Sequence, residues 1–321
     1  TRVTSSYRRR ESRAGPRSAP AAMDAAVVHG HQLLAQFWAD TEHFQAVIYR
    51  TPFTSGRCVY YTIGCYLFTI FSLQFVMKFF RPLRLKYLTA LHNLFLCLLS
   101  LTMAVGVAFE FWRHPQSIYV MSCGPLGTEY KGRLFFWYYI FYLSKFYELL
   151  DTVILVLRKK QLSFLHVFHH IITLTQFWII TTLHVPPFMT FGPIIFNTCV
   201  HVIMYFYFCS CALGYYWDQS WRKRITQMQL TQFVVDAAFP LAWPVYEFIL
   251  APRTCYGREV LVPFMTFNQG VLVSFFCLFY SFYRRQYCSP KRAAGKAAPS
   301  QAQGSGQGKG NGKGKGKRKM A

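Results

Sequence analysis

The sequence predicts an all-α polytopic membrane protein with seven transmembrane helices packed as a bundle. Of its 321 residues, 53% are hydrophobic and only 15% are charged, whereas about a quarter of a soluble domain is charged. The charged residues gather in the tails and in short connectors, between apolar stretches long enough to cross a bilayer. These stretches are residues 58–80, 88–111, 134–157, 162–183, 187–213, 227–250 and 260–283.

Polar or helix-ending segments separate the stretches in order. The connectors at residues 81–86, 158–161 and 222–224 are short and basic. The fourth helix is expected to end before the proline pair at residues 186–187, because proline cannot continue a helix hydrogen-bond ladder. The two remaining connectors are longer and mixed in charge.

Basic residues also predict the orientation of the bundle, because cytoplasmic connectors of membrane proteins are enriched in Lys and Arg. The three basic connectors and the tail after the seventh stretch all fall on one side, which is therefore predicted to be the cytosol. The N-terminus is then lumenal. The net charge of +23 arises largely in the tails and connectors, so it does not predict nucleic-acid binding.

We accordingly divide the chain into three parts. Residues 1–57 form a lumenal N-terminal segment, residues 58–283 the membrane domain, and residues 284–321 a basic, disordered cytosolic tail. Met23 is a candidate for the native first residue, which would place residues 1–22 outside the native chain.

Two short features follow from the predicted orientation. Cys123 and Cys255 both face the oxidising lumen, so we expect a disulfide between them, with two free thiols as the alternative. Lys317 and Lys319, near the end of the cytosolic tail, resemble a dilysine retrieval signal of the endoplasmic reticulum. A disordered Gly/Lys tail is the alternative interpretation of the same residues.

Polar side chains inside five of the stretches fall in one layer near the cytosolic side. An ionisable group in a membrane span is costly and by default indicates function. His166, His169 and His170 follow i, i+3, i+4 spacing and share one helix face. The other members of the layer are His92, Asn93, Lys145, Glu148, Asp151, Thr152, Asn197, His201, Thr226, Gln229, Gln232 and Asp236.

This layer predicts a site inside the bundle that opens to the cytosol. Part of it has a structural alternative: Lys145 and Glu148 have the spacing of an internal ion pair. A polar helix–helix contact is likewise the alternative for His92, Asn93, Thr226, Gln229, Gln232 and Asp236.

Three functions compete for this site. A membrane di-iron oxygenase uses boxes of His ligands, but only five His lie within the spans, which is too few for that class of enzyme. A non-enzymatic seven-span receptor or transporter fits the outline but gives no reason for the His cluster. Acyl transfer or condensation fits best, because a His can be the nucleophile and a nearby carboxylate can orient it.

Four motifs resemble those of the very-long-chain fatty acid elongase (ELO) family. The members of this family are 3-ketoacyl-CoA synthases of the endoplasmic reticulum. Residues 145–152 fit KxxExxDT, and residues 161–170 fit QxxFLHxxHH. Residues 197–208 fit NxxxHxxMYxYY except at the last position, where Phe208 replaces Tyr. Residues 226–232 fit TxxQxxQ, and the resemblance extends over about residues 58–283.

The resemblance implies condensation of a long-chain acyl-CoA with malonyl-CoA to give 3-ketoacyl-CoA, CO₂ and CoA. Decarboxylation supplies the nucleophile, so no metal or redox cofactor is expected. The family fold implies a helical bundle around an acyl tunnel, with CoA at the cytosolic mouth. Expected partners are the lipid bilayer, the ketoacyl reductase, dehydratase and enoyl reductase of the elongation cycle, and a further copy of the chain as a homo-oligomer.

The resemblance also suggests residue roles. His169 is expected to accept the acyl group, with His166 or His170 assisting it or being oriented by Asp151. His201 is expected to bind the malonyl carboxylate or stabilise the enolate. The residues expected to bind substrate or CoA are Lys145, Glu148, Arg158, Lys159, Gln161, Asn197, Tyr205, Gln229 and Gln232. The preferred acyl chain length and unsaturation are not readable from the sequence.

Overall fold

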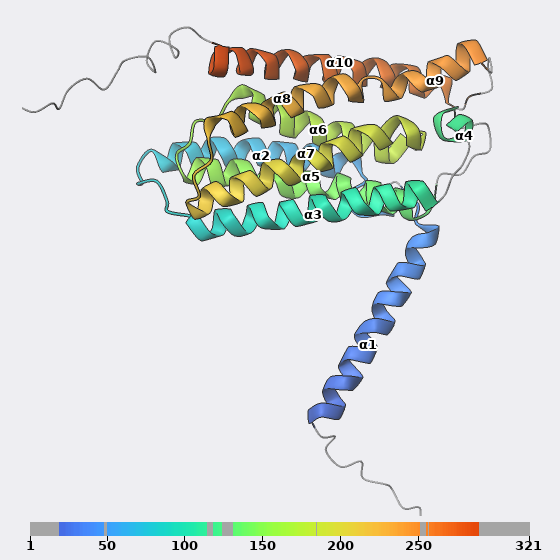
Figure 1. The fold of residues 1–321 in the computed structure, drawn as a ribbon, viewed down its shortest axis with the longest axis horizontal. Helices are drawn as coiled ribbons and strands as arrows, with labels where there is room; N and C mark the ends of the chain where they lie inside the picture. The colour runs from blue at the N-terminus through green and yellow to red at the C-terminus, as the bar shows by residue number, and fades with distance from the viewer. Residues whose placement is uncertain are drawn as a thin grey trace, which may run out of the picture.

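The computed structural model describes residues 19–47, 50–113, 118–123, 131–183, 185–250, 255 and 257–288. Every regular element in these ranges is a helix, as predicted. Seven long helices lie alongside one another in a bundle (Figure 1). They are α2 (Gly56–Met77), α3 (Lys86–Arg113), α5 (Arg133–Leu157), α6 (Phe164–Leu183), α7 (Pro187–Leu213), α8 (Gln219–Asp236) and α10 (Arg258–Tyr283).

Six of these helices close into a ring. Their contacts run from α3 to α7, α8, α10, α6 and α5, and from α5 back to α3. Helix α2 packs outside the ring against α5 and α6. The interior of the ring is where the polar layer predicted from the sequence lies.

Six segments of the described chain are long and apolar enough to cross a membrane. They are α2, α3, α6, α7, the run Gln219–Leu250 and the run Arg258–Cys288. Helix α5 has sufficient length, with 25 residues, but carries Lys145, Glu148 and Asp151 close together. The predicted count of seven spans is therefore not confirmed, because the same charges that indicate a site make α5 polar.

Shorter elements interrupt or flank the bundle. The predicted span 227–250 is broken after α8 into η2 (Phe239–Leu241), α9 (Ala242–Val245) and η3 (Tyr246–Leu250). The elements that were not predicted include α1 (Ala19–Asp40), which leaves one end of the bundle at an angle (Figure 1), η1 (Thr41–His43) and α4 (Ile118–Cys123). The last described turn is η4 (Arg284–Cys288).

The helix ends follow from local chemistry. Pro187 is the first residue of α7, where its missing N–H costs no hydrogen bond. Gly214 ends α7 with a φ of 104°, a left-handed conformation that glycine adopts without strain. The Asp218 side chain accepts a hydrogen bond from the Ser220 N–H at 3.2 Å and caps α8.

A disulfide ties together two connections at one end of the bundle. Cys123 ends α4 (Ile118–Cys123) and is bonded to Cys255, with Cα atoms 4.7 Å apart. This is the pair expected from the sequence. The predicted retrieval residues Lys317 and Lys319 lie outside the described residues, as does most of the predicted tail.

Candidate active site

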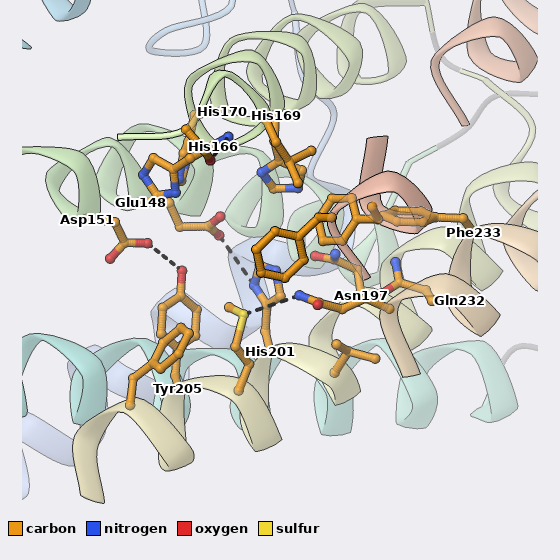
Figure 2. A pocket seen from close by; sticks show the side chains of 18 residues that line it. Glu148, Asp151, His166, His169, His170, Asn197, His201, Tyr205, Gln232 and Phe233 are labelled. Atoms are coloured by element: carbon orange, nitrogen blue, oxygen red, sulfur yellow. Dashed lines mark hydrogen bonds and ion pairs between the residues drawn. The ribbon is translucent and has the colours of Figure 1, made fainter. Parts of the chain in front are cut away.

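A cavity of about 280 Å³ lies between α5, α6, α7, α8 and α10. Polar side chains from all the predicted motifs reach it, and large apolar side chains complete its wall (Figure 2). Its lining consists of Glu148, Asp151, Ser163, Leu165, His166, His169, His170, Asn197, Val200, His201, Met204, Tyr205, Phe208, Gln229, Gln232, Phe233, Phe279 and Phe282.

Helix α6 contributes the three histidines to one wall. The ring of His170 lies 4.5 Å from that of His166 and 5.5 Å from that of His169, measured between centroids. The His166 Nε2 atom hydrogen-bonds Thr152 Oγ1 at 2.9 Å. The His169 ring packs against Phe275 of α10 at 5.1 Å and makes no such bond among those found in the described chain. The predicted shared face of α6 is thus present, and of its three rings His166 is the one with a side-chain hydrogen bond among those found in the described residues.

A buried charged cluster from α5 and α7 forms the facing wall. Lys145 donates to Glu148 Oε1 at 2.8 Å and to Asn197 Oδ1 at 3.3 Å. The same Glu148 oxygen lies 3.8 Å from His201 Nδ1 (Figure 2). Lys145 and Glu148 are only 3% and 2% exposed. Glu148 therefore neutralises the lysine and places a carboxylate beside the His201 ring.

Asp151 is held from two other helices. Its Oδ1 atom lies 2.5 Å from His92 Nε2 of α3, and its Oδ2 atom accepts a hydrogen bond from Tyr205 OH of α7 at 2.8 Å. We expected Asp151 to orient His166 or His170, but in the structure Thr152 is the partner of His166. The carboxylate thus joins α3, α5 and α7, and α3 packs against both of the other two helices.

Helix α8 places two amides at the edge of the cavity. Gln229 donates to the sulfur of Met204 at 3.5 Å, and Gln232 donates to Asp236 at 3.0 Å. The two side chains lie about one helix turn apart on the same face of α8, as their spacing predicts, and both line the cavity.

The sequence matches the family described as ELO: GNS1/SUR4 family over residues 51–295. It is 38% identical over 242 residues to fatty acid elongase A of Dictyostelium discoideum, and the aligned region covers 74% of this chain and 85% of that protein. It is 35% identical over 251 residues to fatty acid elongase sre1 of the same organism, with 77% and 89% covered. Very long chain fatty acid elongase 7 of Rattus norvegicus is 35% identical over 181 residues, with 54% and 63% covered.

The chain belongs to the GNS1/SUR4 (ELO) family. The resemblance drawn from the four motifs is thereby confirmed. Membership also sets aside the oxygenase and receptor alternatives, because neither accounts for a match over this length.

Four residues expected to bind substrate in this ELO protein lie away from the cavity wall. Lys145 is buried and paired with Glu148, and its expected contact with CoA phosphates stays a prediction. Arg158 lines a second cavity. Lys159 and Gln161 line a third, of about 260 Å³, between the end of α2 and the α5–α6 connector.

Sequence reasoning missed two contributions to the ELO site. His92 was placed in the polar layer with a helix–helix contact as the alternative, and only the fold shows that its partner is Asp151. The aromatic residues Phe233, Phe279 and Phe282 line the cavity but carry no signal in a sequence with 32 Phe.

Proposed function

We propose that this chain is a fatty acid elongase, a very-long-chain 3-oxoacyl-CoA synthase. It condenses a fatty acyl-CoA with malonyl-CoA to give 3-ketoacyl-CoA, CO₂ and CoA. Membership of the ELO family and the names of the relatives support this function. The observation that carries it is that four histidines and two carboxylates, from three helices, line one cavity.

In this proposal His169 accepts the acyl group. A nitrogen of its imidazole attacks the thioester carbonyl, the carbon–sulfur bond breaks, and CoA leaves. Decarboxylation of malonyl-CoA then forms an enolate, which attacks the acyl carbonyl and frees His169. His201, which lies 3.8 Å from Glu148, stabilises the enolate oxygen or binds the malonyl carboxylate. The scheme uses no metal or redox cofactor.

The membrane arrangement extends the proposal. We take α5 as the seventh span and the interior of the six-helix ring as the acyl tunnel. The N-terminus is lumenal and the C-terminus cytosolic, in the endoplasmic reticulum. The three-part division at residues 57 and 283, CoA at the basic end, an association with the other enzymes of the elongation cycle and formation of a homo-oligomer belong to the same proposal.

The test is a condensation assay on microsomes that contain the full chain. Labelled malonyl-CoA is supplied with a panel of acyl-CoAs, and products two carbons longer are sought. We expect labelled ketoacyl-CoA from the wild type and a loss of about 10²-fold or more in His169→Ala, as for removal of a nucleophile or its base.

His43→Ala is the matched control, because His43 lies in η1 at the far end of the bundle and is exposed. It should retain wild-type activity. No labelled product from any acyl-CoA, with the protein inserted in the membrane, would refute the elongase function.

A further inference from the structure

A second cavity, of about 290 Å³, lies behind Asp151 between α3, α5, α6 and α7. It shares Asp151, His166 and Phe208 with the reaction cavity, so these three side chains form the partition between the two spaces. The full lining is Thr89, His92, Asn93, Asp151, Ile154, Leu155, Arg158, His166, Phe208, Cys211 and Ala212. No residue role in the proposed reaction accounts for this space.

Its polar wall is built around His92. The ring is 6% exposed, its Nε2 atom lies 2.5 Å from Asp151 Oδ1, and it stacks on Tyr147 at 5.2 Å with an interplanar angle of 23°. Neighbouring Asn93 is turned back onto its own helix, where it donates to the Thr89 carbonyl at 2.6 Å. His92 is therefore fixed in place, with Asp151 between it and the reaction cavity.

The position of this cavity suits contact with water. Its residues come from the start of α3 and the ends of α5 and α7, which meet at the end of the bundle opposite the disulfide (Figure 1). Arg158, half-buried at the end of α5, lies on that side. The hydroxyl, amide, imidazole and guanidinium groups of the lining supply the two to four polar partners that an ordered water needs.

The proposed reaction requires a proton, and this inference rests on that proposal. One acyl carbon–sulfur bond breaks, one carbon–carbon bond forms, and the malonyl carboxylate departs as CO₂. The CoA thiolate that leaves must take up one proton for the equation to balance. That proton comes from solvent, and the reaction cavity is filled by substrate when it is needed.

We propose that the second cavity is a water-filled compartment that supplies this proton through Asp151. His92 is the positioning residue: it holds Asp151 at the partition and returns a proton to it from the water side. Asp151 faces both cavities, so a proton that it accepts on one side is available on the other. The titratable or charged groups around His92 are Tyr147, Asp151 and Arg158 of α5, His166 of α6, and Cys211 of α7.

The first test replaces His92 by Gln, which keeps an amide donor for Asp151 but does not titrate. We expect kcat of the full chain to fall by about 10²-fold, in the range for loss of proton transfer, with KM for both CoA esters unchanged. The pH profile of kcat should lose one ionisation. A lower kcat with an unaltered pH profile would show a merely structural role and overturn the proposal.

The second test fills the compartment without touching His92. Ala212→Phe projects into the second cavity, which Ala212 lines, while Leu213→Phe adds the same ring at the next, exposed position. We expect a lower kcat and an unchanged KM for Ala212→Phe, and wild-type values for Leu213→Phe. An unchanged kcat, or a raised KM for either CoA ester, would overturn the proposal, the latter by assigning the space to substrate.

These outcomes are separable from failure of the elongase function. A wild type that forms no labelled ketoacyl-CoA refutes the function and this inference together. An active wild type with an active Ala212→Phe variant refutes only the inference, and it does so even where His92→Gln does not fold.

Discussion

Glu148 is the residue on which the buried part of the site depends. One of its oxygens meets the Lys145 ammonium, the Ser144 hydroxyl at 3.1 Å and, at longer range, His201. The lysine in turn lies over the ring of Phe141 at 4.1 Å. A buried charge is tolerated only when it is paired, so the Lys145 ammonium and the Glu148 carboxylate compensate each other's burial.

Removing the lysine should therefore destabilise the fold. Lys145→Met leaves Glu148 buried without its counter-charge, which costs about 3–5 kcal/mol in comparable cases. We expect a lower unfolding temperature, measured by size-exclusion chromatography after heating. The control is Lys160→Met, which removes an exposed lysine of the α5–α6 connector. Equal stability of the two variants would contradict the role given to the ion pair.

At this scale the sequence predicted residue types better than partners. The spacing of His166, His169 and His170 follows from the helix repeat alone, so their shared face was predictable. The partner of Asp151 was not, because His92 is 59 residues away and only the packing of α3 on α5 brings them together. The burial of Lys145 was not predictable for a similar reason, because it depends on how the helices of the ring pack and not on the motif.

At the scale of the helices, small residues set how closely the ring packs. A Cβ atom on Gly106 of α3 would lie 2.2 Å from the Trp137 ring of α5, whereas one on Gly64 of α2 meets nothing within 4 Å. Small residues allow close helix contacts in membranes. Gly106 thus allows the close approach of α3 to Trp137 of α5.

The two glycines therefore predict opposite effects. Gly106→Ala should destabilise the protein by about 1–3 kcal/mol through overpacking, and Gly64→Ala should stabilise it by about 0.5–1 kcal/mol, because alanine favours a helix interior. Unfolding temperatures of the two variants in the same detergent measure both. A Gly106→Ala variant as stable as Gly64→Ala would mean that Trp137 moves freely.

The disulfide acts between elements rather than within one. Cys123 and Cys255 are 132 residues apart and join α4 to the segment before α10. Cys123→Ser should lower stability by about 2–5 kcal/mol, and adding Cys255→Ser should cost little more, because the bond is already lost. Thermal unfolding with and without reductant measures this, with exposed, free Cys65→Ser as the control. Equal reductant sensitivity of wild type and Cys123→Ser would contradict it.

Most long helices were predictable within a few residues, since length and apolar composition define them. The break after Asp236 was not, although Pro240 and Pro244 lie beyond it. The sequence predicted one continuous span over residues 227–250 because the composition of this segment stays apolar. Helix α1 was missed since it lacks the apolar run of a span, and its apolar side chains, such as Leu33, Leu34 and Phe37, remain exposed.

At the scale of the whole molecule, the ring explains how a charged helix can cross a membrane. Helix α5 contacts α2, α3 and α6 and carries its charges toward the interior. The side chains of Lys145, Glu148 and Asp151 are only 3%, 2% and 17% exposed. Charges that face a bundle interior avoid lipid, so the composition of α5 does not prevent it from spanning.

Thiol labelling at the two ends of α5 tests this. Lys131 precedes the helix and Lys159 follows it, and both are exposed. In sealed microsomes, Lys159→Cys should react with a membrane-impermeant thiol reagent above the wild-type background, since the basic end faces the cytosol in our proposal. Lys131→Cys should react only after permeabilisation.

If both variants react in sealed microsomes, α5 does not cross the membrane. The chain then has an even number of spans, and the two termini lie on the same side. If instead only Lys131→Cys reacts, α5 crosses the membrane but the bundle is inverted. The basic end that we propose binds CoA would then face the lumen, which contradicts the orientation predicted from the positive-inside rule.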